Sequence, residues 1–438
     1  MKSIFIISMW LMATLCCSQQ FSKSEMDSLF AALEKNNKGM GNLSIFYDGK
    51  EIYNKSIGYA DIDKKIKIDN NTKFRIGSIS KSFTATIIMQ LIEEGKLKLD
   101  QTVDKFFKDI KNSDSITIEM LLHHRSGIHN FTDDPAYMSW SGKPISHEEL
   151  LEKIVAGGID FEPNAMTKYS NSNFILLTLI VEELEKNSYD KILEKRIIKP
   201  LRLKRTNFGT KINTATNEAL PYYYSGKWNL GTETDVSVPL GAGGIVSTSH
   251  DLNVFMYALQ NGKLISPESF QKMKDIISGL GLGLIEFSFN DKKSYGHGGA
   301  IDRFLSNSEY FDEDKLGISY CTNGVAMNIY EIRQAVLSIY FNIPYQVVEF
   351  MPALKLKEEE LKVYQGEYSC ATLPYKIKFS VQNAALVGQK TDRPPFPLEA
   401  FDKDKFRFGP AGMVLEFSPA ENSFVLKQGG QTFEFKRE

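Results

Sequence analysis

The sequence has few cysteines and lacks the common metal-binding patterns. Its 438 residues contain four cysteines, of which Cys16 and Cys17 lie near the start of the chain. The other two, Cys321 and Cys370, are too few for a disulfide framework, so we expect two buried free thiols. Neither C-x-x-C nor H-E-x-x-H occurs. We therefore expect no metal site and no cofactor.

An excess of charge of either sign is also missing. The 52 basic and 54 acidic side chains leave a formal net charge of -2. A strongly basic balance would indicate nucleic acid or an anionic membrane as a partner. We expect neither, and a small-molecule or peptide substrate is the partner that we expect instead.

Long apolar runs are scarce as well, and the main one is at the N-terminus. It extends from Ile4 to Leu15, which is too short to span a bilayer. A single basic residue precedes it and small residues follow, the pattern of a secretory signal peptide over residues 1–18. The sequence therefore predicts a secreted or periplasmic protein without an integral membrane span. A lipid anchor on Cys16 or Cys17 is an alternative that the bulky Leu15 disfavours.

The length of the chain indicates more than one domain, because a single hydrophobic core rarely serves more than about 250–300 residues. Residues 19–342 mix apolar helix patterns with strands and are predicted to form the main domain. Residues 343–360 contain prolines and a charged run, which is typical of a linker. In residues 361–438 apolar and polar residues alternate, with a turn at Gly429–Gly430. This pattern predicts a small antiparallel β-barrel or sandwich.

Local signals predict several elements in the main domain. A serine-capped helix that ends at Gly39 comes first, followed by a hairpin around Asp48–Gly49. Residues 101–240 are predicted to be mostly helix and loop. Apolar patterns predict buried helices over 78–94 and 174–184, strands in GLGLIEFSF, FLSNSEYFD and LGISYCTNG, and a final helix in AMNIYEIRQAVLSIYF.

The stretch FRIGSISKSF, residues 74–83, opens the first buried helix and contains an S-x-x-K pair. SYDK and SFQK are further copies of the pair, so a capping serine and a solvated lysine are the plain alternative. Two features favour Ser78 as a nucleophile and Lys81 as its base. Residues three apart lie on one helix face, and the helix start supplies N–H groups and a dipole that stabilise negative charge. Burial in the apolar run that follows would lower the pKa of Lys81 towards that of a useful base.

Two more short motifs follow in order, YSN at 169–171 and HGG at 297–299. With SISK at 78–81, they resemble the S-x-x-K, Y-x-N and H-x-G motifs of the class C serine β-lactamases and their relatives, the DD-peptidases, D-aminopeptidases and esterases. The connecting segments ITIEMLLHHRSGI and GAGGIVSTSHDL are similar to segments of the same family. The resemblance covers roughly residues 25–342. The C-terminal part resembles, in its strand pattern alone, the lipocalin-like accessory domains of some of these hydrolases.

The resemblance implies a role for each motif residue. Ser78 would be the acylated nucleophile, Lys81 its base, and Tyr169 the group that passes a proton to the leaving group. Tyr169 would do so with a pKa lowered by the nearby Lys81. The backbone N–H groups of Ser78 and Ala300 would form the oxyanion hole.

The same resemblance implies a substrate-binding wall. Asn171, Gly298 and Gly299 would contact the substrate, and the glycines would allow close approach of the ligand. His297 would be catalytic, either by orienting Tyr169 or by meeting a substrate carboxylate. A histidine with an ordinary pKa of about 6.5 would favour carboxylate-bearing substrates as the pH falls from 8 to 6.

Departures from the family pattern also bear on the site. The Pro-Gly that commonly precedes the tyrosine motif is Pro163–Asn164 here, and asparagine is the next most tolerant residue of a left-handed turn. His297 stands where many relatives have lysine, which weakens the link to β-lactam hydrolysis. His123, His124 and His129 have no ligand-type neighbours in the sequence and are interpreted as structural.

The sequence therefore predicts an α/β (α+β) fold in which helices flank an antiparallel sheet. A helical insertion would form the other wall of the cleft, and a small all-β barrel would follow. The expected activity is hydrolysis of amide or ester bonds through an acyl-enzyme, with cell-wall-type peptides, other D-amino-acid amides or small esters as substrates. A catalytically silent, penicillin-binding-like sensory or binding protein is the alternative. A Ser-His-Asp hydrolase using Ser78, His297 and Asp251 or Asp302 is disfavoured, because no G-x-S-x-G occurs.

Overall fold

The computed structural model describes residues 21–344, 354–373, 375–382, 384–391 and 395–438. The predicted signal peptide, residues 1–18, and the middle of the predicted linker, residues 345–353, lie outside this described part. Within it, no helix combines the length and the apolar character that crossing a membrane would need.

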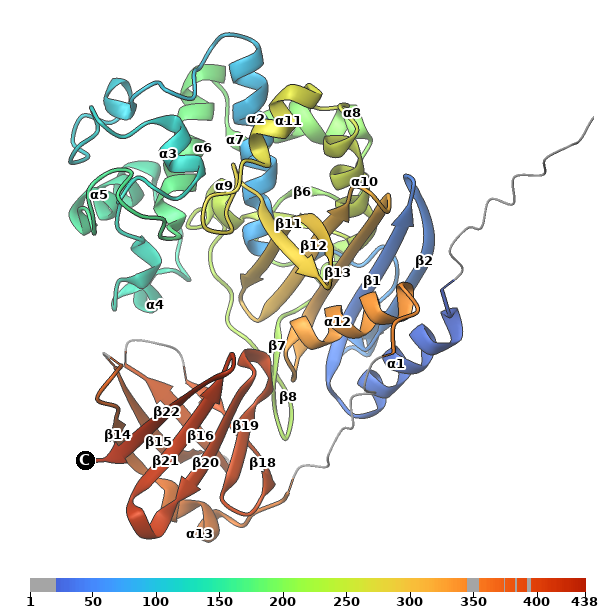
Figure 1. Cartoon of the computed structure of the whole chain (residues 1–438), viewed down its shortest axis with the longest axis vertical. Coiled ribbons are helices and arrows are strands. Elements are labelled where there is room, and N and C mark those ends of the chain that lie inside the picture. Colours follow the sequence, from blue (N-terminus) through green and yellow to red (C-terminus); the bar gives the residue numbers. More distant parts are fainter. Residues whose placement is uncertain (1–20, 345–353, 374, 383, 392–394) are drawn as a thin grey trace, which may run out of the picture.

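Six of the described strands form an antiparallel sheet at the centre of the larger part of the molecule (Figure 1). In spatial order they are β10 (Ile285–Phe289), β11 (Lys292–Ile301), β12 (Phe304–Phe311), β13 (Leu316–Val325), β1 (Gly39–Tyr47) and β2 (Lys50–Ile57). Strands β1 and β2 form the hairpin predicted at Asp48–Gly49, where both turn residues have positive φ. Strands from the two ends of the domain thus pair at the β1–β13 contact.

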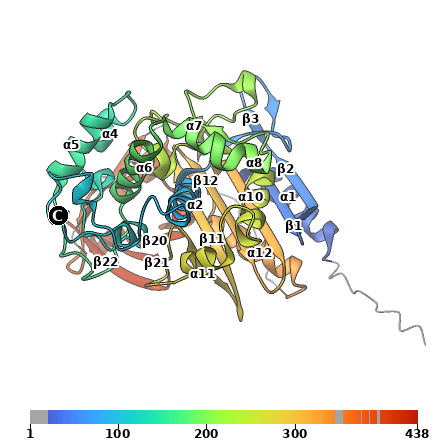
Figure 2. The same ribbon diagram turned by 90° about the horizontal axis from the view of Figure 1, so that it is seen from above.

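Helices cover both faces of this sheet (Figures 1 and 2). On one face lie α1 (Lys23–Lys35) and α12 (Ile329–Tyr340), whose apolar side chains form one core with β1, β2 and β13. On the other face lie α2 (Ser80–Glu93) and α10 (Ser249–Gln260), within the larger core. Successive strand residues point to opposite faces, so β1 and β13 contribute to both cores and are buried almost throughout.

A helical region lies beside the sheet and contains α6 (Asn171–Glu185), the second apolar helix predicted. The other helices are shorter: α3 (Ile118–Leu122), α4 (Tyr137–Trp140), α5 (His147–Gly157), α7 (Tyr189–Leu193), α8 (Lys199–Leu201), α9 (Leu240–Gly243) and α11 (Pro267–Met273). Small ladders complete this part: β3 (Tyr59–Asp61), β4 (Ile66–Lys67), β5 (Phe74–Arg75), β6 (Asn207–Phe208), β7 (Tyr222–Ser225), β8 (Lys227–Leu230) and β9 (Ile245–Ser247). The predicted fold class is confirmed.

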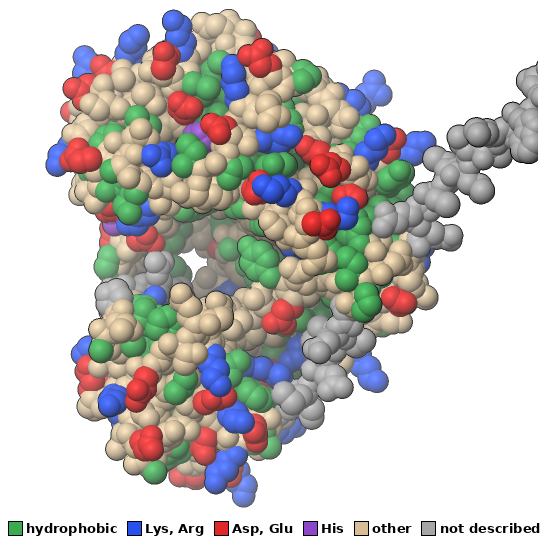
Figure 3. Space-filling model, viewed as in Figure 1, with side chains coloured by type: hydrophobic (Ala, Val, Ile, Leu, Met, Phe, Trp, Pro, Cys, Tyr) green, Lys and Arg blue, Asp and Glu red, His purple; other side chains and the backbone are tan. Residues whose placement is uncertain are grey.

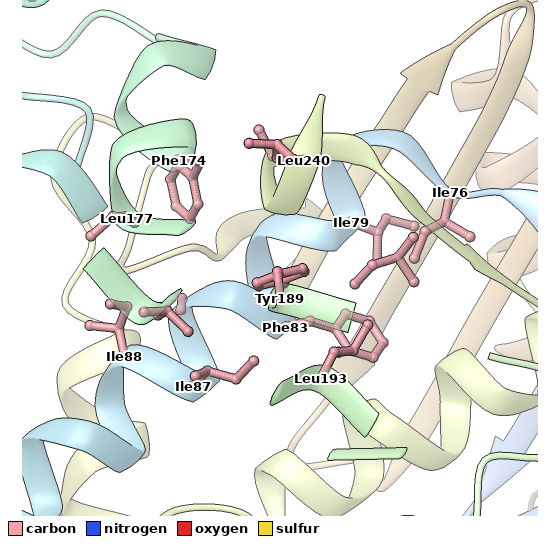
Figure 4. Close-up of a cluster of buried hydrophobic side chains, with 14 of the residues drawn as sticks. Ile76, Ile79, Phe83, Ile87, Ile88, Phe174, Leu177, Tyr189, Leu193 and Leu240 are labelled. Atoms are coloured by element: carbon pink, nitrogen blue, oxygen red, sulfur yellow. The ribbon is translucent and has the colours of Figure 1, made fainter. Parts of the chain in front are cut away.

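Helix α2 is buried on nearly every side and fixes the position of Ser78 (Figure 4). Phe83, Ile87 and Ile88 pack with side chains of α6 and α7 in the cluster that Figure 4 shows. The segment before α2, η1 (Gly77–Ile79), is a single 3₁₀ turn. Ser78 therefore precedes the α-helix proper, and the close packing of the helix holds this turn in place.

Nine of the described strands in the C-terminal part form a second antiparallel sheet, which follows the short helix α13 (Glu358–Leu361). In spatial order they are β17 (Phe396–Pro397), β16 (Ala385–Lys390), β15 (Lys376–Gln382), β14 (Gly366–Ser369), β22 (Gln431–Arg437), β21 (Ser423–Gln428), β20 (Met413–Ser418), β19 (Lys405–Phe408) and β18 (Glu399–Asp402). Only Leu398 separates the two edge strands in the chain, so the sheet curls into a nearly closed barrel with a largely aromatic core. The predicted turn at Gly429–Gly430 joins β21 to β22.

The barrel contacts the central sheet through an ion-pair cluster and one tight turn. Lys38, just before β1, lies with its Nζ 3.1 Å from the Glu399 carboxylate, which also accepts a hydrogen bond from Arg407. Gly409 packs closely against Ala326, which follows β13, and a Cβ on this glycine would overlap the Ala326 carbonyl oxygen. The two parts of the molecule are therefore in direct contact.

Three features differ from the sequence-based expectations. Helix α1 ends at Lys35 rather than at Gly39, because β1 begins at that glycine. Local signals miss strand β11, whose segment KKSYGHGGAI has three glycines, and pairing with β12 decides its structure. Cys321 and Cys370 are both unpaired, but only Cys321 is fully buried, and burial raises the pKa of its thiol to about 12.

Candidate active site

Ser78 and Lys81 meet at a cleft in the larger part of the molecule. Ser78 is half-buried in the turn before α2, whereas Lys81, one turn later, is completely buried. The Lys81 amine nitrogen lies 3.0 Å from the Ser78 hydroxyl oxygen. It also lies 2.8 Å from Asn171 Oδ1 and 2.7 Å from the Ala242 carbonyl oxygen. The structure thus brings the serine and lysine of the SISK motif into hydrogen-bond contact.

The surroundings of Lys81 favour its neutral form. Burial lowers the pKa of Lys81 well below its ordinary value, because a charged amine loses its hydration there. The oxygens of Asn171 and Ala242 can only accept hydrogen bonds, so the two N–H groups of a neutral amine donate to them. The remaining lone pair then faces the Ser78 hydroxyl. Lys81 is therefore placed to take the serine proton.

Tyr169 lies beside this pair with its hydroxyl buried. Its ring stacks on His124 at 4.3 Å between centroids, and the Lys81 amine lies 5.0 Å from the Tyr169 ring centroid. Among the described residues the hydroxyl has no hydrogen-bond partner. Burial raises the pKa of Tyr169, and the nearby Ser78 hydroxyl only partly opposes this effect. The expectation of a lowered pKa is wrong, because burial of the phenol has the larger effect and raises its pKa.

His297 lies on β11 and is buried. Its Nδ1 donates to the Gly298 carbonyl oxygen at 2.5 Å, and its ring centroid is 6.3 Å from that of Tyr169. Burial lowers the pKa of His297 to about 3. The ordinary pKa assumed from the sequence is therefore wrong, and His297 stays neutral between pH 6 and 8. It cannot provide the charge that was expected to select carboxylates as the pH falls.

The turn that carries Ser78 packs directly on β11. Gly77 has φ of +51°, and a Cβ on it would lie 2.8 Å from the Ala300 backbone nitrogen. A larger residue at this position would push the strand away. Ser78 and Ala300 both line the cleft, so their backbone N–H groups are the candidates for the oxyanion hole.

The two glycines of the HGG motif have different surroundings. A Cβ on Gly299 would overlap the Ile76 carbonyl oxygen, so this glycine admits the neighbouring backbone rather than a ligand. A Cβ on Gly298 would find no atom nearer than 3.8 Å. Close packing of β11 on the turn before α2 thus explains Gly299. Gly298 is not among the residues that line the cleft, and its contact with the substrate stays a prediction.

Asn171 is the first residue of α6 and reaches both Lys81 and the cleft. Its amide nitrogen donates to Asn130 Oδ1 and Thr132 Oγ1, each at 3.2 Å. These two acceptors orient the amide so that its oxygen faces Lys81. The contact with the lysine adds a positioning role to the substrate contact that the sequence suggested.

The cleft in front of Ser78 has a volume of about 860 Å³. One wall is formed by the end of β11 and the turn to β12, and the other by residues before and within α4. In the space-filling view the molecule is hollowed between the region of α4 and the barrel (Figure 3). Phe131, Tyr137, Met138, Ile301 and Leu305 give the lining much of its apolar surface.

The two carboxylates considered for a Ser-His-Asp site have other partners. Asp302 pairs with Arg75 at 2.7 Å, and Asp251 accepts hydrogen bonds from the backbone N–H of Arg205 and the hydroxyl of Thr206. Neither carboxylate therefore serves His297, as a Ser-His-Asp hydrolase would need. Within the described ranges, no three His, Cys, Asp or Glu side chains are grouped as metal ligands.

The sequence analysis missed two contacts of the candidate site. His124, interpreted as structural, stacks on Tyr169 and accepts a hydrogen bond from the Ser170 N–H at 3.1 Å. Burial lowers the pKa of His124 well below its ordinary value. Its place in the family-like segment ITIEMLLHHRSGI is the signal that could have identified it. No sequence signal identifies Ala242, because it acts through its backbone carbonyl and every residue has a backbone carbonyl.

Comparisons with known proteins agree with this geometry. The family model described as Beta-lactamase matches residues 26–337. The putative penicillin-binding protein PbpX of Bacillus subtilis (strain 168) is 32% identical over 241 residues, which cover 53% of this chain and 58% of that protein. Protein flp of Staphylococcus aureus (strain MRSA252) is 27% identical over 303 residues, 65% of this chain and 60% of that protein. The matches thus span about three fifths of these relatives' own length.

Solved structures give the same result. D-amino acid amidase from Ochrobactrum anthropi SV3, complexed with L-phenylalanine amide, superposes with a TM-score of 0.66 at 25% identity, covering 73% of this chain and 99% of the amidase. The octameric penicillin-binding protein homologue from Pyrococcus abyssi has a TM-score of 0.63 at 23% identity and covers 94% of this chain and 99% of its own. The second likeness shows a shared fold that extends into the C-terminal part. Because the family model spans most of the chain, this protein belongs to the beta-lactamase family.

Proposed function

We propose that this protein is an exported serine hydrolase that cleaves amide or ester bonds through an acyl-enzyme on Ser78. The observation that carries the proposal is the completely buried Lys81, held 3.0 Å from the Ser78 hydroxyl oxygen, with a pKa that burial lowers. A serine hydroxyl needs a base to become a nucleophile, and an uncharged amine at this distance is one. Export rests on the predicted signal peptide of residues 1–18.

In the first step Lys81 takes the Ser78 proton while the serine oxygen forms a bond to the substrate carbonyl carbon. The carbonyl oxygen becomes an oxyanion next to the N–H groups of Ser78 and Ala300. Lys81 gains a positive charge at this moment, and that charge further stabilises the oxyanion in a site with little water. Asn171 and Ala242 still accept hydrogen bonds from the charged amine.

In the second step the bond to the leaving group breaks, and the leaving atom needs a proton. Tyr169 can donate it, because burial keeps the phenol protonated and its hydroxyl has no other described partner. The proton on Lys81 then restores the phenol. Hydrolysis of the acyl-enzyme reverses the sequence, with water as the attacking group and the Ser78 oxygen as the leaving atom. His124 and His297 stay neutral and hold the Tyr169 ring between them.

D-amino-acid amides, cell-wall-type peptides and small esters are the proposed substrates. The size of the cleft, about 860 Å³, and its partly apolar lining suit a short substrate with an apolar side chain. The likeness to a D-amino acid amidase and to penicillin-binding proteins supports this class.

The test is mass spectrometry of the intact protein with a fluorophosphonate and with a panel of D-amino-acid amides, D-Ala-D-Ala peptides, β-lactams and short esters. We expect a single adduct that maps to Ser78, and release of product from at least one amide or ester. Ser78→Ala should remove both, whereas Ser82→Ala, on the buried helix next to the site, should keep the adduct on Ser78. An adduct at another serine would contradict the proposal. A stable adduct without product from any substrate would favour the silent, penicillin-binding-like protein instead.

A further inference from the structure

Arg303 occupies a turn that is strained for an arginine. It follows Asp302 in the two-residue connection between β11 and β12, and both residues have positive φ, 52° for Asp302 and 79° for Arg303. Non-glycine residues rarely adopt such values, because the Cβ crowds the backbone. Glycine would fit this turn without strain. Backbone strain of this kind is concentrated at functional sites, so the side chain of Arg303 needs an explanation.

The guanidinium of Arg303 has no acidic partner in the described structure. It makes neither a hydrogen bond nor an ion pair with any described residue. The cleft lining contains three carboxylates, of which Asp302 and Glu233 are bound by Arg75, at 2.7 Å and 2.5 Å, and Asp134 is exposed. Thr234 also donates to Asp302 through its N–H and its hydroxyl. A half-buried cation is thus left available next to carboxylates that already have partners.

Contacts with the segment around β7 and β8 hold the Arg303 side chain in place. The centre of its guanidinium lies 5.3 Å from the Tyr223 ring centroid, a cation–π contact. A Cβ on Gly231 would lie 3.1 Å from Arg303 Cγ, so this glycine leaves room for the aliphatic part of the side chain. A side chain held in this way loses little conformational freedom when a ligand binds, which favours affinity.

Arg303 lines the cleft of Ser78 and Ala300, and it also lines a second, smaller cavity next to the barrel, to which Tyr223 and Glu399 belong. It follows Ala300 by three residues, so its Cα lies within about 10 Å of the Ala300 Cα. A substrate with its carbonyl oxygen at the Ala300 N–H can therefore place a second group at Arg303 one or two residues from the scissile bond.

We propose that Arg303 binds a carboxylate of the substrate and is the residue that selects anionic substrates. This assignment rests on the proposed function, because it concerns the substrate of the Ser78 site. A planar guanidinium with free N–H groups binds a carboxylate through two parallel hydrogen bonds. It keeps its charge at every physiological pH, which the neutral His297 cannot do.

Two matched pairs of D-alanine thioesters test the assignment in the full-length protein. One pair carries a carboxylate or a carboxamide on the leaving group, and the other carries a succinyl or a succinamoyl group on the amine. The variants are Arg303→Gln, Arg303→Gly, and Lys227→Gln as a control. Lys227 is an exposed residue of β8 with the same charge and does not line the cleft. Fluorophosphonate labelling of Ser78 is measured for each protein.

In one of the pairs the wild type should prefer the carboxylate by about tenfold or more in kcat/KM, equally at pH 6 and pH 8. Both Arg303 variants should bring the ratio of carboxylate to carboxamide kcat/KM close to one. The kcat/KM of the carboxamide substrate should change by less than about twofold. Lys227→Gln should keep the preference of the wild type. Arg303→Gly relieves the strained turn and should melt no lower than the wild type, so misfolding cannot account for a lost preference.

Equal losses for both members of a pair in the Arg303 variants would overturn the assignment and indicate a structural role. A wild type that is labelled at Ser78 but shows no preference in either pair, or cleaves neither pair, would overturn it as well and leave the proposed function standing. A wild type that is not labelled at Ser78 would instead contradict the proposed function.

Discussion

The surroundings of Lys81 and the interior of the barrel are two cores of opposite chemistry. Near Ser78, a lysine and two histidines, Lys81, His124 and His297, are buried among apolar side chains. In the described part of the barrel, Ser423 is the only buried side chain that is neither apolar nor aromatic. Burying an ionisable group costs free energy that an apolar side chain would not. The first core therefore sacrifices stability, and the second does not.

This difference indicates what each part contributes. The buried amine and imidazoles have pKa values shifted towards their neutral forms, which the proposed chemistry needs. In the described part of the barrel the core is largely aromatic and contains no buried ionisable side chain like Lys81 or His297. We therefore expect substitutions near Ser78 to change activity more than stability, and substitutions inside the barrel to do the opposite.

The largest effect is expected from Lys81→Met. It removes the base but keeps the volume of the side chain, so acylation of Ser78 by an ester substrate should fall by about 10²–10⁴-fold. The melting temperature should stay the same or rise, because an apolar side chain replaces a buried amine. Stopped-flow acylation and calorimetry measure the two quantities. A variant that melts far below the wild type would show that Lys81 is structural and would remove the contrast between the cores.

Phe424→Ala tests the other core. Phe424 is completely buried and stacks on Phe435, with ring centroids 4.7 Å apart, so the cavity should destabilise the barrel by about 3–5 kcal/mol. Labelling of Ser78 should change by less than about twofold. The described tryptophans, Trp140 and Trp228, both precede the barrel. Tryptophan fluorescence can therefore follow unfolding of the larger part, and pulse proteolysis can follow unfolding of the barrel. A loss of Ser78 labelling while the larger part stays folded would show that the barrel completes the site.

The pH dependence of stability gives a smaller effect that belongs to the first core. Because the pKa of Lys81 is lowered in the folded protein, the unfolded chain holds one more proton between that value and about 10.4. The free energy of unfolding should therefore rise with pH in this window, by at most about 1.4 kcal/mol per unit for this group. Urea unfolding of the wild type and Lys81→Met at pH 6, 7.5 and 9 isolates the contribution. Parallel curves would mean that Lys81 is charged in the folded protein.

The smallest effect is expected where the two parts meet. Glu399→Gln removes the charge that Lys38 and Arg407 share, and partly exposed ion pairs of this kind contribute about 1 kcal/mol or less. The labelling of Ser78 and the melting temperature of the barrel should both stay unchanged. Hydrogen exchange at Ala326, beneath Gly409, reports the contact. A large loss of activity would couple the barrel to the site and contradict the separation of roles.

Patterns that are local in the sequence predicted much of this protein. The hairpin at Asp48–Gly49, the two buried helices and the alternating strands of the barrel follow from turn residues and periodicity, and the structure contains them. Strand β11 could not be predicted in this way, because its glycines suit a strand only when β12 and the turn before α2 pack against it. Long-range contacts decide such a segment.

The candidate site divides in the same way. Spacing along one helix sufficed to bring Ser78 and Lys81 together, since residues three apart share a face. The pKa values of Tyr169 and His297 could not be read from neighbouring residues in the chain, because burial under distant segments sets them. The available charge of Arg303 was missed for a related reason, since the acids near it in the cleft are paired with Arg75.

The short edges of the barrel sheet bear on self-association. An open sheet presents unpaired N–H and C=O groups along its outer strands, and another chain can add to them as an extra strand. Here the two outer strands, β17 and β18, contain only two and four residues and follow one another in the chain. Short edge strands are poor templates for strand addition, so we expect little edge-to-edge pairing between copies of this sheet.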